Sequence, residues 1–179
     1  MVARPSAERI VNQALDNNAR LVGKLYEEYA GPVFNYVWRL VGDHDLAEDL
    51  TQETFARVLA ARERLPDVVN RRAWVYRVAT NTCFRALRRR GRFAWLPWYA
   101  VVSDDRGDPA EEIGRNNLVE EALQALRPEY RAPLILYLHD GLALAEVAEA
   151  LGISEGAVKT RIYRAREMFR RAYNRETSR

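Results

Sequence analysis

The sequence predicts an all-α protein made of two small helical domains joined by a linker, with a helix-turn-helix in the C-terminal domain. Apolar residues recur at helical spacing along most of the 179 residues. This periodicity is lost between Gly91 and Gly114, where proline, glycine and acidic residues gather. Two short helical patterns then meet at Gly152, as in a helix-turn-helix. We expect domains at 1–92 and 116–179 and a linker at 93–115.

The first domain should begin with a helix over 18–30, because Leu21, Leu25 and Tyr29 share one face. Gly31 and Pro32 predict a break or kink, after which the helical pattern resumes. Gly42 is expected to end it, as a glycine after a helix often does.

A second helix is expected from Asp43 to Leu65. Either Asp43 or Asp45 can cap its start, and acidic residues crowd its first turns, which suits the helix dipole. Pro66 is expected to end it. The predicted core stripe consists of Leu46, Leu50, Phe55, Val58 and Leu59.

A third helix is predicted from about Arg71 to Arg90, with Tyr76, Ala79, Cys83 and Leu87 as its apolar stripe. Cys83 is the only cysteine, so an internal disulfide is excluded. Its place in the stripe favours a buried thiol over a redox sensor.

In the linker, Trp95 and Trp98 either pack back on their own domain or contact a partner surface.

The second domain should begin near Asn116. Pro128 fits the first turn of a helix that Gly141 ends. A short helix then leads to the turn at Gly152. Ser154 is expected to cap a last helix that runs to about Tyr173.

Charge is unevenly distributed, although the net charge is only +3. Residues 71–92 contain eight arginines and no acid, and residues 157–179 have a net charge of +6. The remainder of the chain is therefore strongly acidic. Two cationic helices suggest two contacts with a polyanion, although solvated helix faces are the alternative.

The last helix is the strongest indication of DNA binding. Its apolar stripe faces inward, and polar and cationic residues occupy the other faces. An α-helix fits the major groove, where Arg and Lys can pair with guanine edges and the others can neutralise phosphates. The candidate DNA-binding residues are Ser154, Lys159, Thr160, Arg161, Tyr163, Arg164 and Arg166.

Two stretches resemble a known family. DLAEDLTQETFARVLA, followed by RRAWVYRVATNTCFRALRRR, resembles the promoter-melting domain of extracytoplasmic-function (ECF) sigma factors of the sigma-70 family. LRPEYRAPLILYLHDGLALAEVAEALGISEGAVKTRIYRAREMFRRAY resembles the family's C-terminal domain, which binds the minus-thirty-five element. The resemblance implies an alternative sigma factor, not an enzyme. Such a factor binds core RNA polymerase and promoter DNA, melts DNA, serves a stress or envelope response and is controlled by an anti-sigma factor.

The resemblance also implies residue roles. Core polymerase is expected to bind Asp45, Asp49, Gln52 and Glu53, for which the alternative is an ordinary solvated acidic face. The minus-ten element is expected to bind Arg71, Arg72, Trp74, Arg77, Asn81, Arg85 and Arg88, although Trp74 is equally well explained as a core residue. The connector Leu65–Asn70 matches the family loop that holds a flipped base.

Two other classes of function remain as alternatives. One is a helix-turn-helix regulator that binds DNA without polymerase. The other is a metal-dependent phosphohydrolase built on the His44–Asp45 pair, but only His139 remains as a further histidine. We therefore expect no cofactor, no metal and no catalysis. The polar N-terminus and the lack of an apolar run of about 20 residues predict a cytoplasmic protein without direct membrane insertion.

Overall fold

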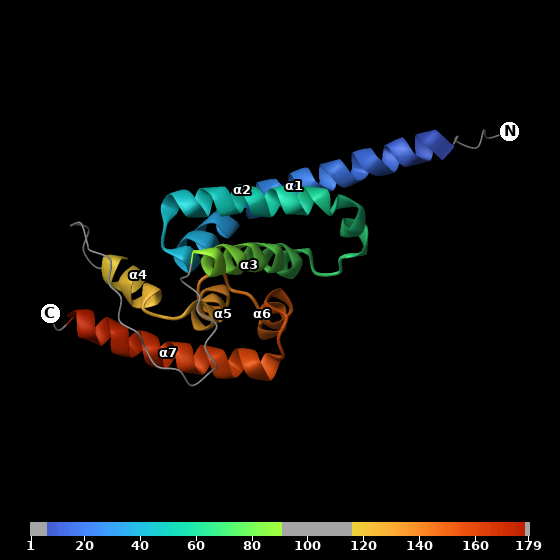
Figure 1. The fold of residues 1–179 in the computed structure, drawn as a ribbon. Helices are drawn as coiled ribbons and strands as arrows, with labels where there is room; N and C mark the ends of the chain where they lie inside the picture. The colour runs from blue at the N-terminus through green and yellow to red at the C-terminus, as the bar shows by residue number, and fades with distance from the viewer. Residues whose placement is uncertain (1–6, 91–115, 178–179) are drawn as a thin grey trace.

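The computed structural model describes residues 7–90 and 116–177, and every element in these two stretches is a helix (Figure 1). The N-terminal half consists of α1 (Ala7–Val41), α2 (His44–Ala60), the 3-10 helix η1 (Arg62–Asp67) and α3 (Arg71–Arg89). The C-terminal half consists of α4 (Asn116–Gln124), α5 (Pro128–Leu138), α6 (Leu144–Leu151) and α7 (Glu155–Thr177). The all-α prediction is confirmed. The linker and its residues Trp95 and Trp98 lie outside the described residues.

Helix α1 is longer and more continuous than expected. It begins at Ala7 and runs through Pro32 without interruption, so the predicted break is wrong. Gly31 and Pro32 both lie on the exposed side of the helix. A proline there removes one backbone hydrogen bond, but water can reach the carbonyl that is left free.

A tight corner joins α1 to α2. Gly42 adopts φ 73°, a left-handed conformation that glycine tolerates best. The Asp43 carboxylate then accepts a hydrogen bond from the Leu46 backbone N–H at 2.9 Å, so Asp43 caps α2. Helix α2 ends at Ala60, and Pro66 lies within η1. Leu59 is 48 % exposed and not part of the core, because adjacent Val58 takes the inward position about 100° away.

Helix α3 packs on α1 through the predicted apolar stripe, and its members Tyr76, Ala79, Cys83 and Leu87 are all buried. A polar pair lies inside this core: Tyr36 Oη and Thr80 Oγ1 are 2.7 Å apart. The rings of Tyr36 and Tyr76 meet edge to face at 5.4 Å. The stripe prediction for α3 is therefore confirmed.

The C-terminal half follows the expected order. Pro128 occupies the first turn of α5, and Gly141 and Gly152 both adopt φ 65°. Ser154 Oγ accepts a hydrogen bond from the Ala157 backbone N–H at 3.2 Å, which confirms it as the cap of α7. Helix α7 continues to Thr177, past the predicted end near Tyr173.

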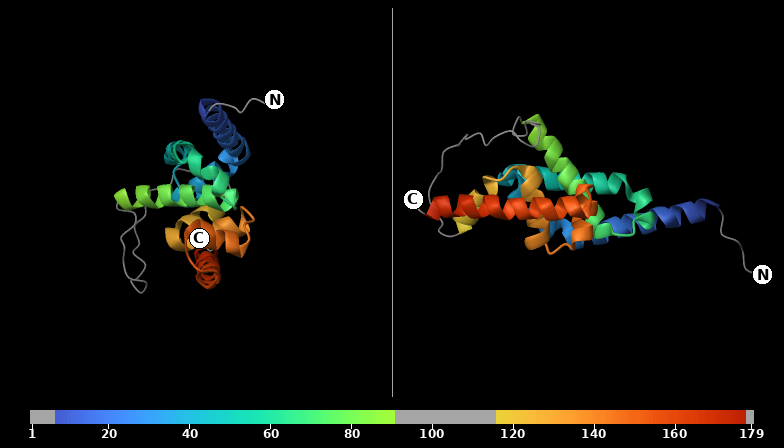
Figure 2. Two further views of the ribbon diagram at one scale, coloured as in Figure 1. Left: turned by 90° about the vertical axis from the view of Figure 1, so that its right-hand side faces the viewer. Right: turned by 90° about the horizontal axis from the view of Figure 1, so that it is seen from below.

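The two halves pack against each other, an arrangement that the sequence left open. Helix α6 packs against α3, and α4 and α5 pack against α1 (Figures 1 and 2). Helix α7 packs on α4, α5 and α6, on the side away from α2. The surfaces of α3 and α7 are thus held in one body.

Candidate protein and nucleic-acid interfaces

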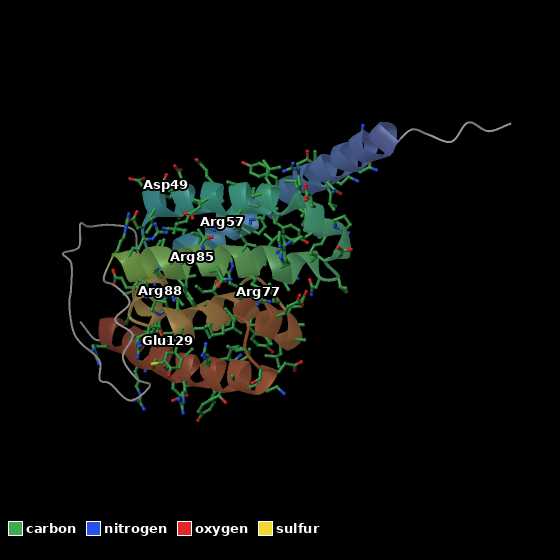
Figure 3. All side chains as sticks on the ribbon, turned by 45° about the vertical axis from the view of Figure 1, so that its right-hand side comes forward. Asp49, Arg57, Arg77, Arg85, Arg88 and Glu129 are labelled. Atoms are coloured by element: carbon green, nitrogen blue, oxygen red, sulfur yellow. The ribbon has the colours of Figure 1, made fainter. Side chains whose placement is uncertain are left out.

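The outer face of α2 carries the residues predicted to bind a protein. Asp45, Asp49 and Gln52 are exposed and fall on one stripe of the helix, since they are four and three residues apart. Figure 3 marks Asp49 on α2. This arrangement gives an acidic, solvent-facing stripe on a helix whose opposite side is anchored by Leu46 and Leu50.

Two neighbours of this stripe, Arg57 and Leu59, were not recognised from the sequence as parts of this surface. Glu53 is partly buried, and Arg57 binds its carboxylate through Nε at 3.0 Å and Nη2 at 2.6 Å. The fork holds Glu53 in one orientation, although a half-exposed pair of this kind adds little stability. Leu59 extends the same stripe with an apolar group. Leu59 is exposed because the helical period places it near the angular position of Asp45 about the axis of α2, on the outer face of the helix.

Helix α3 presents a cationic stripe to solvent. Arg77, Asn81, Arg85 and Arg88 are all exposed and recur every three or four residues. Figure 3 shows three of these arginines spaced along α3. The structure therefore brings these four predicted residues together on one face. No carboxylate of α3 competes for them, because this helix contains no acidic residue.

The first turn of α3 is arranged differently. Asn70 caps the helix by accepting a hydrogen bond from the Ala73 N–H at 3.0 Å. Arg71 is exposed, whereas Arg72 is partly buried and donates a hydrogen bond to the backbone carbonyl of Asp140. Trp74 is partly buried against the core, so its role as a core residue or as a stacking surface stays a prediction.

The connector before α3 exposes one apolar side chain that sequence reasoning missed. Val69 is fully exposed at 102 %, whereas Leu65 at the start of the same connector is fully buried. The connector is therefore fixed to the core at Leu65 and offers an apolar group to solvent at Val69.

Helix α7 directs Thr160, Tyr163 and Arg164 away from its buried stripe. All three are exposed, and Tyr163 reaches 69 % exposure. Lys159 is also exposed, whereas Arg161 is partly buried on the other flank. These outward residues form the face that could enter a groove of DNA.

Three predicted residues of the helix-turn-helix have further contacts. The Ser154 hydroxyl is engaged in capping, and Thr160 Oγ1 donates to the Gly156 carbonyl at 3.0 Å. The methyl group of Thr160 thus remains for apolar contact. Arg166 is exposed but lines a groove facing α1, away from the outward face of α7.

This groove has a volume of about 860 Å³ and lies between the two halves. Its apolar lining includes Trp38, Leu138 and Phe169, and Leu138 is 55 % exposed. Arginine side chains border it: Arg39, Arg166 and Arg170. Apolar surface with cationic edges is suited to an amphipathic, acidic segment of a protein.

The metal site that was considered as an alternative at His44 and Asp45 is limited to a surface pair of side chains. His44 Nδ1 lies 3.7 Å from a Glu48 carboxylate oxygen on the exposed surface of α2. Within residues 7–90 and 116–177, no three His, Cys, Asp or Glu side chains are grouped as metal ligands would be. In the same residues, no helix combines the length and apolar composition needed to cross a membrane.

Two family models match the chain. Sigma-70 region 2 matches residues 25–93, and sigma-70 region 4 matches residues 116–169. The chain belongs to the ECF sigma factors of the sigma-70 family. In the terms of this family, α3 lies in region 2, and α6 and α7 form the helix-turn-helix of region 4.

Relatives support the same assignment. The ECF RNA polymerase sigma factor SigL of Mycobacterium tuberculosis is 34 % identical over 164 residues, covering 87 % of this chain and 90 % of SigL. The ECF RNA polymerase sigma factor SigE of Mycolicibacterium smegmatis is 33 % identical over 157 residues, covering 82 % of this chain. The match spans only 59 % of the length of SigE.

A solved structure shows the same fold. The sigma factor RpoE of Bartonella quintana, in complex with the anti-sigma factor NepR, superposes with a TM-score of 0.67. It is 23 % identical, and the superposition covers 85 % of this chain and 96 % of RpoE.

Proposed function

We propose that this protein is a promoter-specificity subunit that binds core RNA polymerase, recognises two promoter elements and takes part in DNA melting at the start of transcription. The supporting observation is the presence of two separate exposed cationic helices, α3 in region 2 and α7 in region 4, in one chain. A regulator that acts without polymerase needs only the second.

Helix α2 is proposed to bind core polymerase. Its outer stripe, with Asp45, Asp49 and Gln52, is exposed, while its inner side is fixed in the region 2 core. A rigid acidic helix complements a basic protein surface and speeds association. Exposed Leu59 would add apolar contact at the end of this stripe.

Helix α3 is proposed to hold the minus-ten element. Separated DNA strands require a cationic track for phosphates and groups that stack on, or hydrogen-bond to, exposed bases. Arg77, Arg85 and Arg88 supply the track, and the Asn81 amide can pair with a base edge. Exposed Val69 and partly buried Trp74 lie at the end of α3 where a displaced base would be received.

Helix α7 is proposed to read the minus-thirty-five element in the major groove. Tyr163 and Arg164 point outward from the middle of the helix, and Lys159 and Thr160 lie one turn earlier. Arginine and lysine recognise guanine or phosphate, and the threonine methyl fits the thymine methyl.

The second part of the proposal is that an anti-sigma factor controls this protein in a stress or envelope response. We also propose that the protein acts in the cytoplasm. The fold of RpoE, which this chain shares, was solved with an anti-sigma factor bound. The groove at Trp38, Leu138 and Phe169 offers apolar surface edged by arginines. An inhibitor that contacts this groove should stop transcription by the unmodified factor in a purified system. The same inhibitor should bind the Leu138→Glu variant more weakly and should no longer stop its transcription.

The decisive test is transcription by purified core polymerase with and without this protein, on genomic fragments with start sites mapped. Initiation that depends on the factor, from a few promoters sharing two spaced elements, supports the proposal. DNA binding without binding to core would instead identify a simple helix-turn-helix regulator.

Charge reversal separates the surfaces. Asp49→Lys should weaken core binding at least tenfold, whereas Glu63→Lys, an equal charge change at an exposed position of η1, should leave it unchanged. Arg164→Ala should weaken promoter binding and retain core binding. Equal core affinity for Asp49→Lys and Glu63→Lys would remove α2 from the proposed interface.

A further inference from the structure

The groove between the two halves is built from four helices. The end of α1, α4, α5 and one side of α7 all contribute lining residues, and α4 and α5 both pack on α7 (Figure 1). Three lining residues, Leu123, Leu134 and Ile135, are buried members of the core. The volume of about 860 Å³ lies within the range of about 300–1,000 Å³ that is typical of small-molecule sites.

The rest of the apolar lining is open to water. Leu138 of α5 and Val119 of α4 are exposed, and Trp38 of α1 is only partly buried. On α7 the rings of Phe169 and Tyr173 stack with their centroids 6.0 Å apart, and both rings line the groove. A hydrocarbon chain that lay against these side chains would remove apolar surface from water on both sides of the contact.

Two arginines stand side by side at the α7 edge of the groove. Arg166 and Arg170 are four residues apart and both line it, so they are neighbours on one face of the helix. Arg170 pairs with Glu167 at 3.0 Å, whereas Arg166 has no ion-pair partner within residues 7–90 and 116–177. Like charges at this spacing repel each other, and an anion bound between them would relieve the repulsion.

A single carboxylate, that of Glu120, occurs among the described residues that line the groove. Its charge is already compensated, because Arg39 Nε lies 3.2 Å from Glu120 Oε1. The Arg39 guanidinium also lies over the Trp38 ring, 5.8 Å from the ring centroid. The groove thus has an apolar lining and an excess of positive charge, which the α7 edge supplies.

We propose that this groove is a binding site for a free long-chain fatty acid, with its alkyl chain against Leu138 and Phe169 and its carboxylate at Arg166 and Arg170. The inference deepens the proposed control at this groove. It rests on the proposed function for one consequence, which is that a bound fatty acid would compete with an inhibitor for the same surface.

The chemistry of the groove selects this class of ligand in two ways. A carboxylate is a planar acceptor that fits the two-pronged guanidinium group, whereas the arginines would repel an amphiphile with a cationic head. A short organic acid would satisfy the arginines but leave the apolar lining in water. Each methylene group that is fully buried strengthens binding by about fourfold, so chain length should matter as much as charge.

The test measures binding of the fluorescent fatty acid 11-(dansylamino)undecanoic acid to the purified full chain. Arg166→Gln removes the arginine that lacks an ion pair, and Arg171→Gln makes the same change at an exposed position of α7 outside the groove lining. The bound probe is then displaced with dodecanoate, octanoate or dodecylamine, each kept below the concentration at which it forms micelles.

The unmodified chain and Arg171→Gln should bind one equivalent of the probe with equal affinity. Arg166→Gln should bind it about tenfold more weakly, because a hydrogen bond from a charged donor is lost. Dodecanoate should displace the probe at a concentration at least tenfold lower than octanoate, and dodecylamine should not displace it in the same range. Leu138→Gln leaves the charges unchanged and should bind the probe several-fold more weakly. Far-UV circular dichroism spectra equal to that of the unmodified chain show that the variants are folded.

Equal probe affinities for Arg166→Gln and Arg171→Gln would overturn the proposal, as would equal displacement by dodecanoate and dodecylamine. Binding to phosphatidylglycerol vesicles that is lost in Arg166→Gln, without saturable binding of the probe, would also overturn it and would assign the groove to a membrane surface. None of these measurements involves polymerase or DNA. A failure here is therefore distinct from a failure of initiation with core polymerase, which would contradict the proposed function itself.

Discussion

Replacing Arg131 with methionine should destabilise region 4 and loosen its contact with α1. The Arg131 side chain is 5 % exposed, and its guanidinium donates to the carbonyls of Leu40 at 2.8 Å, Gln124 at 2.7 Å and Leu126 at 2.6 Å. It also donates to the side-chain carbonyl of Gln124. Methionine fills a similar volume but leaves all these acceptors without a donor.

The magnitude follows from two opposing contributions. Each hydrogen bond from a charged donor contributes about 1.5–3 kcal/mol, and three backbone carbonyls accept one. Burial opposes this, because it lowers the pKa of Arg131 to about 10, equivalent to roughly 3 kcal/mol of desolvation. Each buried carbonyl that is left without a donor costs about 1–3 kcal/mol. We therefore expect the free energy of unfolding to fall by about 3 kcal/mol.

The assay is urea unfolding of the full chain followed by circular dichroism, with Arg127→Met as the matched control. Arg127 pairs with Glu129 at 2.8 Å, but its side chain is 38 % exposed. Its loss should cost less than about 1 kcal/mol, as for other surface ion pairs. Arg131→Lys keeps the charge but lacks the planar fork, so it should resemble Arg131→Met more than the unmodified protein.

Equal unfolding midpoints for Arg131→Met and Arg127→Met, with equal slopes, would refute this reasoning. Such a result would mean that water replaces the guanidinium at these carbonyls at no net cost. A separate early transition in Arg131→Met would instead show that region 4 unfolds alone, and the two transitions would then be fitted independently.

Three further predictions concern single side chains. Cys83 is buried and burial raises the pKa of its thiol, so native protein should react with a disulfide reagent at least a hundredfold more slowly than protein in urea; fast native labelling would contradict a core thiol. The pKa of Glu146 is lowered from its ordinary 4.5, chiefly by the hydrogen bond from the Ala143 N–H. The contribution of the charged Glu146 carboxylate to the free energy of unfolding is therefore fully present above pH 4.5, and it is lost as the pH falls through the lowered pKa. The difference in unfolding free energy between the unmodified protein and Glu146→Gln should shrink between pH 7 and pH 3. Trp74→Ala, if it remains folded, should reduce the formation of open complexes on a promoter duplex. Normal melting by this variant would assign Trp74 to the core.

Local signals in the sequence predicted the individual helices well. Gly152 and Ser154 located the turn and the start of α7, because a left-handed glycine and a capping hydroxyl act within a few residues of themselves. The same period of 3.6 residues that identified the buried stripe of α3 also identified the exposed Arg77 and Asn81.

Features set by distant contacts could not be predicted in this way. Arg71 and Arg72 are equivalent in the sequence, but a rotation of 100° leaves one exposed and turns the other toward Asp140. Leu59 was assigned to the core on hydrophobicity alone. Arg131 carried one signal in retrospect, a charge within an otherwise apolar stretch of α5, which often marks a buried residue with several acceptors.

The hydroxyl pair in the core of region 2 determines how α3 is rotated about its own axis. The Thr80 hydroxyl donates to the Tyr76 carbonyl of its own helix at 2.8 Å, so Tyr36 Oη is the donor to Thr80 Oγ1, and Tyr36 finds this acceptor only in one setting of α3 against α1. Thr80 is adjacent to Asn81, so the angle that satisfies the buried hydroxyl also directs the amide outward. Purely apolar packing would tolerate slippage between near-equivalent rotations. The buried polar pair therefore fixes the orientation of the α3 surface that is proposed to bind DNA.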